Sequence, residues 1–124
     1  LDMKRYSHLL AGASWRAEYG DPDTDDWSYL KHNSAYHNID EKKAPFPKLL
    51  MTTSTKDDRV HPYHARSFVK RLQDLGVEDV YYYENIEGGH GGAADAKQSA
   101  YVVALYQDFL FCALGGKRAG CGDP

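Results

Sequence analysis

The chain has 124 residues, of which 15 are basic and 18 acidic, giving a formal net charge of −3 with neutral histidines. This length allows at most one domain with a single core, and it is small for a complete α/β enzyme. Because the chain is slightly acidic and no basic cluster exceeds two residues, nucleic acid is not an expected partner. No apolar run approaches the ~20 residues that a membrane span requires, so a membrane is not expected either.

The first residue and the length of the chain indicate whether the sequence is a whole protein or a piece of one. It begins at Leu1 rather than at a methionine, and it is short for the fold that its later segments indicate. We therefore expect it to be a piece of a longer protein. No signal peptide is visible, which for a piece leaves the compartment open between cytoplasm and periplasm.

Residues 1–44 contain only weak signals for regular structure. Residues 1–3 are too short to classify, with the end of a strand as one interpretation. Two large aromatic residues stand between glycines at 12–20, and an acidic loop follows at 21–26. Thr24 or Asp25 is a suitable N-cap for a predicted helix over residues 26–32, because a short oxygen acceptor there satisfies a free backbone N–H.

From residue 45 onward the pattern predicts alternating strands and helices. Residues 49–53 and 80–84 have the apolar, β-branched and aromatic composition of strands. Apolar residues between them recur at three- and four-residue steps up to Gly76, which predicts an amphipathic helix and hence one right-handed parallel crossover unit. A last helix over residues 95–114 is apolar on more than one face, so we expect it to pack on the sheet and on further protein.

The candidate functional residues follow the carboxyl ends of the two predicted strands. Asp57, Asp58 and Arg59 follow the first strand, and His90 follows the second within Gly-Gly-His-Gly-Gly at residues 88–92. Ligands and reacting groups of open α/β sheets collect at this edge. An aspartate after one strand and a histidine after the next is the order in which an α/β-hydrolase supplies the last two members of its triad.

Each of these residues also has a plain structural interpretation. The glycines around His90 allow a sharp turn near a substrate, but they equally fit a flexible surface loop with a solvated histidine. Asp57 or Asp58 fits as the N-cap of the following helix, so that one of them caps and the other is catalytic. A metal site built from His61, His64 and His90 with one of these aspartates has little support, because no paired ligand motif accompanies it.

The chain offers no recognisable nucleophile. None of its serines lies in a Gly-x-Ser-x-Gly motif, the strand-to-helix elbow that presents the serine of an α/β-hydrolase. Cys112, in an apolar helical stretch, is expected to be a buried side chain, and Cys121, in a glycine-rich tail, to be exposed. Two such cysteines do not predict a disulfide framework or a metal motif. We expect no metal and no cofactor.

Three motifs stand in one order along the chain. They are Gly-Ala-Ser-Trp-Arg-Ala-Glu-Tyr-Gly at residues 12–20, Asp-Asp-Arg-Val-His-Pro at 57–62 with Ala65 and Arg66 downstream, and Gly-Gly-His-Gly at 88–91. In order and spacing the chain resembles the prolyl oligopeptidase family of serine peptidases. The resemblance implies that residues 1–116 are the C-terminal portion of the catalytic domain, a partial α/β-hydrolase fold of parallel strands with flanking helices. Residues 117–124 are then a flexible tail.

The resemblance also implies roles for particular residues. The triad acid maps onto Asp57 and the triad base onto His90. The substrate pocket maps onto four residues, Trp15, Tyr19, Arg59 and Val60. In family members that cleave after proline, the tryptophan and tyrosine line the pocket for the prolyl ring. The ring stacks on the indole, a contact that rewards proline's rigid apolar shape. The arginine binds a substrate backbone carbonyl, and the valine adds an apolar wall.

The sequence departs from the family in what it lacks, since the serine elbow, the oxyanion-hole segment and the N-terminal propeller are absent from these residues. We therefore expect a piece of a peptidase that hydrolyses short peptides after proline, with its serine in a missing N-terminal part. Alone, the chain is expected to be inactive. An esterase or aminopeptidase of the same fold and a non-catalytic assembly module are the alternatives.

Overall fold

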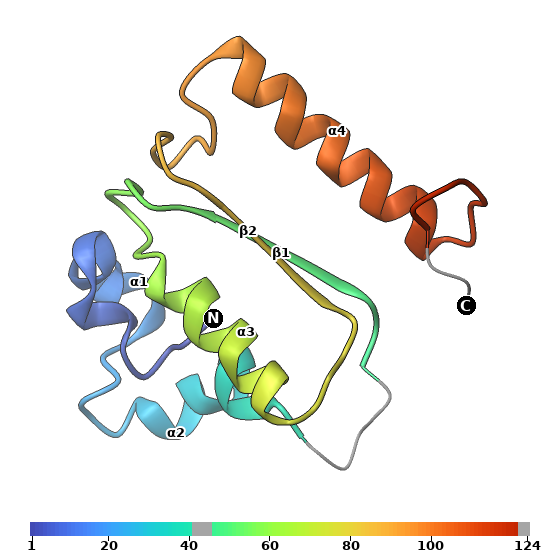
Figure 1. The fold of residues 1–124 in the computed structure, drawn as a ribbon. Helices are drawn as coiled ribbons and strands as arrows, with labels where there is room; N and C mark the ends of the chain where they lie inside the picture. The colour runs from blue at the N-terminus through green and yellow to red at the C-terminus, as the bar shows by residue number, and fades with distance from the viewer. Residues whose placement is uncertain (41–45, 122–124) are drawn as a thin grey trace.

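A computed structural model of the chain describes residues 1–40 and 46–121. The N-terminal part consists of short helical segments, and the remainder alternates strands and longer helices (Figure 1). In chain order the elements are η1 (Tyr6–His8), η2 (Leu10–Trp15), α1 (Arg16–Tyr19), α2 (Trp27–Leu30), η3 (Lys31–Asn33), η4 (Ala35–Asn38), β1 (Leu49–Ser54), α3 (Tyr63–Asp74), β2 (Val80–Asn85) and α4 (Ala96–Ala113).

The sheet formed by the described residues contains β1 and β2, which run parallel in a register that pairs Leu49 with Val80 and Ser54 with Asn85. Helix α3 connects the two strands, as the sequence predicted. Figure 1 shows α3 and the N-terminal segments on one side of the sheet and α4 on the other. This arrangement brings the carboxyl ends of both strands, and the loops that follow them, to one edge.

Helix α3 forms because its apolar positions recur on one face. The buried residues His64, Ala65, Val69 and Leu72 follow the three- and four-residue spacing that the sequence indicated. The helix ends before Gly76, whose φ of 74° lies in the left-handed region that glycine adopts without strain. The buried apolar side chains lie mainly where α3 meets the N-terminal segments, and they include Tyr6 and Leu30.

Helix α4 begins where it was predicted, because the side chain of Asp95 accepts a hydrogen bond from the backbone N–H of Gln98 and so acts as the N-cap. Its rings contact the sheet, with Phe109 packing edge-on against Tyr81. Even so, no residue of this helix is buried, and large apolar side chains such as Leu110 remain exposed. None of the helices in the described parts of the chain is long and apolar enough to cross a membrane.

Two local predictions in the N-terminal part are wrong. Residues 1–3 contain no strand, because their backbone groups bond to side chains and turns rather than to a sheet. Helix α2 starts at Trp27 after Asp26, and no side chain caps it. The Thr24 hydroxyl oxygen instead accepts from the N–H of Asp26 within the preceding loop, so neither Thr24 nor Asp25 is the cap.

The interpretation of the cysteines is also wrong. Cys112 and Cys121 form a disulfide, and Cys112 is only partly buried. The chain reverses after α4 at Gly115, which has a φ of 86°, and returns along the helix. An ion pair of 2.7 Å between Arg118 and Asp108 holds the same return. Sequence spacing alone gave no sign that this reversal would bring the sulfurs together.

Candidate active site

The loop after β1 fixes the Asp57 side chain. Its Oδ1 accepts hydrogen bonds of 2.9 Å from the backbone N–H groups of both Arg59 and Val60. The alternative that Asp57 or Asp58 caps the following helix is wrong, because α3 starts after Pro62 and has no side-chain cap. Asp57 is thus held by its own loop in a single orientation, and only 11% of its side chain is exposed.

The loop after β2 places His90 through a second set of local contacts. The buried side chain of Asn85 accepts from the N–H groups of Glu87 and Gly88 at 3.0 and 2.8 Å, which turns the chain sharply at the end of the strand. A Cβ at Gly88 would lie 2.4 Å from the carbonyl oxygen of Gly92, so the loop closes more tightly than any larger residue permits. Gly88 therefore serves close backbone packing, whereas a Cβ at Gly91 or Gly92 would meet open space.

The two loops bring Asp57 and His90 into direct contact. The Nδ1 atom of His90 lies 3.0 Å from both carboxylate oxygens of Asp57. In this geometry Nδ1–H donates to the carboxylate, and Nε2 is left as the acceptor of the neutral ring. About half of the His90 side chain, 51%, is exposed, so the ring is open to a reaction partner.

The surroundings of Asp57 favour its ionised form. Burial raises the energy of the charged carboxylate, but the backbone N–H groups of Val60 and Arg59 and the His90 ring outweigh that effect, and the pKa of Asp57 is lowered from its ordinary value. A negative charge beside Nδ1 stabilises an imidazolium that forms when Nε2 takes up a proton. The pair therefore has the chemistry of a general base, His90, whose protonated form is stabilised by the Asp57 carboxylate.

A cavity of about 400 Å³ opens beside this pair. Both loops contribute to its lining, together with residues of β1, β2, α3 and α4. Of the serines, Ser54 contributes to the lining, but it is buried and donates its hydroxyl to the carbonyl oxygen of Gly92 at 3.2 Å. Its proton is already given to a backbone acceptor, which does not suit a nucleophile.

The four residues predicted to bind substrate lie at different distances from this cavity. Val60 lines it beside Asp57 and His90. Within the described chain, the lining contains none of the other three, Trp15, Tyr19 and Arg59. Arg59 is exposed on the Asp57 loop, while Trp15 ends η2 and Tyr19 ends α1 with 46% of its residue surface exposed. Their roles in substrate binding stay predictions.

The histidines after Asp57 are occupied by backbone contacts. The Nδ1 of His61 accepts from the N–H of Tyr63 at 3.0 Å, and the Nδ1 of His64 accepts from the N–H of Asp2 at 3.3 Å. Across residues 1–40 and 46–121, no group of three or more histidines, cysteines, aspartates or glutamates is arranged to hold a metal ion. The alternative metal site is not formed by these residues.

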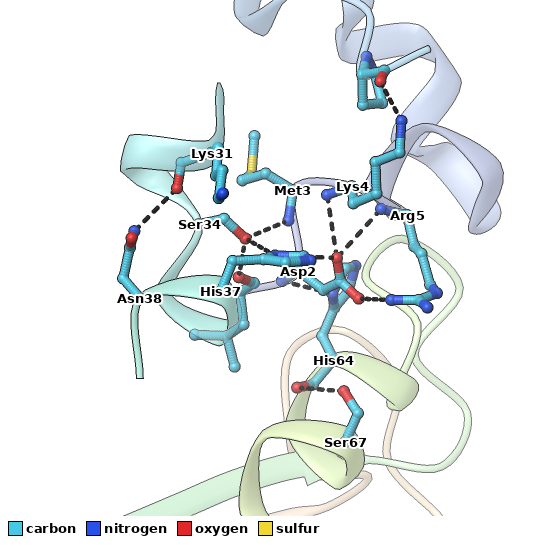
Figure 2. A network of polar contacts seen from close by, with 12 residues as sticks. Asp2, Met3, Lys4, Arg5, Lys31, Ser34, His37, Asn38, His64 and Ser67 are labelled. Atoms are coloured by element: carbon cyan, nitrogen blue, oxygen red, sulfur yellow. Dashed lines mark hydrogen bonds and ion pairs between the residues drawn. The ribbon is translucent and has the colours of Figure 1, made fainter. Parts of the chain in front are cut away.

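Two features of the site were missed from the sequence. Asn85 organises the His90 loop, and its place after a strand and before two glycines is a recognisable signal for an Asx turn. The second feature is a buried polar cluster around Asp2, which Figure 2 shows joined to His64 and Ser34. No local sequence pattern predicts this cluster, because its members are far apart along the chain.

Comparison with known proteins matches most of this chain to one family. The model of the prolyl oligopeptidase family matches residues 1–117. The chain is 46% identical over 112 residues to an uncharacterized peptidase of Sinorhizobium fredii, covering 90% of this chain and 15% of that protein. It is 43% identical over 120 residues to a prolyl oligopeptidase of Omphalotus olearius, covering 93% of this chain and 16% of the relative.

Solved structures give the same result for the fold. A structure of a post-proline cleaving enzyme from Rickettsia typhi matches with a TM-score of 0.80 and 39% identity, covering 88% of this chain and 16% of that one. A structure from a study of two prolyl endopeptidases matches with a TM-score of 0.83 and 34% identity, covering 94% of this chain and 18% of that one. The chain thus spans under a fifth of the length of these proteins. It belongs to the prolyl oligopeptidase family, and its parallel strands with flanking helices are part of an α/β-hydrolase fold.

Proposed function

We propose that the protein carrying this chain is a serine-type peptidase that hydrolyses short peptides after proline. Residues 1–116 act as the C-terminal portion of its catalytic domain, and the nucleophilic serine lies outside this chain. The observation that carries the proposal is the 3.0 Å contact of His90 Nδ1 with both Asp57 oxygens, in a member of this family. Relatives that cleave after proline support the choice of substrate.

The geometry of the pair leads to a two-step acyl transfer. Nε2 of His90 takes the proton of the serine hydroxyl as its oxygen attacks the carbonyl carbon of the peptide bond, and Asp57 stabilises the resulting imidazolium. The imidazolium then gives this proton to the leaving amine nitrogen as the C–N bond breaks, which leaves an acyl-enzyme. A water molecule repeats the sequence with His90 as base, and this step frees the carboxylate product and the serine.

Substrate recognition in this proposal falls to the four mapped residues. The indole of Trp15 and the ring of Tyr19 hold the prolyl ring of the residue whose carbonyl is attacked. The Arg59 guanidinium donates to a substrate backbone carbonyl, and Val60 supplies an apolar wall. Of these, Val60 has the direct support of lining the cavity next to the Asp57 and His90 side chains.

The test uses the full-length protein with three matched substrates: an N-blocked peptide amide with proline before the cleaved bond, the same amide with alanine there, and the ester of the proline peptide. We expect the highest kcat/KM among the amides for the proline peptide. Equal rates for both amides would remove the proline assignment, and cleavage of the ester alone would indicate an esterase. A fourth substrate, the proline amide with a free N-terminus, tests the aminopeptidase alternative, and cleavage of this substrate alone would indicate an aminopeptidase. Unchanged function in Asp57→Asn and His90→Ala would indicate an assembly module.

A further inference from the structure

The most deeply buried charged side chain of the described residues plays no part in the proposed chemistry. Asp2 has no exposed surface, and Figure 2 shows it at the centre of a network of polar contacts. Its Oδ2 accepts from Arg5 Nη1 at 2.7 Å, and its Oδ1 accepts from the backbone N–H groups of Lys4 and Arg5 at 3.0 and 3.3 Å. These contacts fix the chain from residue 2 to residue 5 as a rigid turn.

One end of this turn is fastened to α3. The backbone N–H of Asp2 donates to Nδ1 of His64, in the first turn of that helix, at 3.3 Å. Burial lowers the pKa of His64 to about 4, with smaller effects from nearby charges, so the ring is neutral at neutral pH and Nδ1 is free to accept. His64 follows the Asp57 loop by a few residues and lines the same cavity as Val60.

The other end of the turn is fastened to α1. Tyr6 is 4% exposed, its hydroxyl donates to the carbonyl oxygen of Gly20 at 2.5 Å, and its ring packs edge-on against Tyr19 with 6.0 Å between centroids. The five residues from Asp2 to Tyr6 therefore bridge the start of α3 and the end of α1. Tyr19 ends α1, and the loop that carries Arg59 and Val60 leads into the start of α3.

The chemical nature of this bridge indicates a role beyond stability. Burying a carboxylate and a polar imidazole costs free energy that an apolar pair of similar volume would avoid. Directional hydrogen bonds hold two segments at a set distance and orientation, which apolar contacts do less well. We refer to Asp2, Arg5, Tyr6 and His64 as the clasp.

We propose that the clasp positions Tyr19 relative to the loop of Asp57 to Val60, and thereby sets the affinity for substrate and the preference for proline. This inference rests on the proposed function. The members of the clasp are positioning residues, since they act through Tyr19 and the Asp57 loop and touch no reacting atom.

The test measures kcat and KM of the full-length protein for the proline and alanine amides. His64→Leu removes the acceptor for the Asp2 N–H, whereas His64→Asn places an amide oxygen near the position of Nδ1. We expect His64→Leu to raise KM for the proline peptide at least tenfold with a small change in kcat, and to lower the ratio of proline to alanine cleavage. His64→Asn is expected to restore most of both. The control is His32→Leu, at an exposed histidine of η3.

A second variant keeps the test valid if His64→Leu does not fold. Tyr6→Phe deletes only the hydroxyl that binds Gly20, and it should shift KM and the proline ratio in the same direction, while Tyr29→Phe at a 67% exposed tyrosine should not. A lower melting temperature with unchanged KM and ratio would show that the clasp is merely structural and would overturn the proposal.

The result that would overturn the proposed function differs from the result that would overturn the clasp. Full activity of Asp57→Asn removes the function itself, whereas an inactive Asp57→Asn together with a normal His64→Leu and a normal Tyr6→Phe overturns only the clasp. A wild-type protein that lacks any proline preference overturns the substrate assignment, and the KM of His64→Leu for the peptide it does cleave still decides the clasp.

Discussion

Replacing Asp57 with asparagine exchanges one carboxylate oxygen for an amide group and keeps the shape of the side chain. The backbone N–H groups of Arg59 and Val60 both require an acceptor at the Oδ1 position, so the oxygen of the asparagine stays there. The NH₂ group then faces Nδ1 of His90 and donates to it. The ring proton consequently moves to Nε2, the atom that has to accept the serine proton, and His90 loses its function as a base.

The expected loss can be worked from the contact itself. With the carboxylate 3.0 Å from Nδ1, the charges of Asp57 and a protonated His90 are centred about 4 Å apart. At an effective dielectric constant of about 20 their attraction is about 4 kcal/mol, which corresponds to about 10³ in rate. The wrong tautomer adds to this loss, and replacements of this kind in serine peptidases cost about 10⁴. We expect kcat to fall by about 10³ to 10⁴.

The assay is steady-state hydrolysis of the proline amide by the full-length Asp57→Asn protein, with kcat and KM determined separately. KM should change little, because Asp57 contacts the base and not the substrate. Asp58→Asn is the matched control, since it makes the same change at the exposed neighbouring residue. A kcat within tenfold of wild type, or an equal loss in the Asp58 variant, would show that Asp57 is not the triad acid.

Two further predictions concern the His90 loop and an ion pair between α3 and β2. Gly88→Ala should lower kcat by about 10²-fold, because the added Cβ would force residues 88 and 92 apart and displace His90 between them, and a shift of about 1 Å in a reacting group costs this much. An unchanged kcat would show that the loop adapts. Glu84→Gln should lower stability by about 1–2 kcal/mol at pH 7, a value discounted because its partner Arg66 is 48% exposed. Arg66 holds the pKa of Glu84 at about 2 against an ordinary 4.5, so the stabilisation is present above about pH 4.5 and disappears as pH falls toward 2. Thermal unfolding of both proteins across this range checks it, and a pH-independent difference would contradict it.

The parts of the fold that the sequence predicted are those set by local pattern. Helix α3 follows from apolar spacing and ends before a glycine, and α4 starts at Ala96, within one residue of the predicted start. The contact of Asp57 with His90 was predictable as well, because the ends of parallel strands meet at one edge of a sheet.

The parts that were not predicted depend on contacts between distant residues. The N-terminal segments have no regular period, and their conformation is held by pairs such as Asp2 with His64, which are 62 residues apart. The disulfide depends on a chain reversal after α4, which the spacing of Cys112 and Cys121 does not encode. Local sequence pattern likewise did not predict how the Trp15 segment packs, and only the family resemblance assigned a role to Trp15.

The most direct test of the proposed mechanism is the reaction of the full-length protein with a fluorophosphonate, which modifies a serine only when a base activates it. We predict rapid modification of one serine outside this chain, slowed by about 10² to 10⁴ in His90→Ala. An unchanged rate of modification in His90→Ala would contradict the claim that His90, held by Asp57, is the base of a serine peptidase.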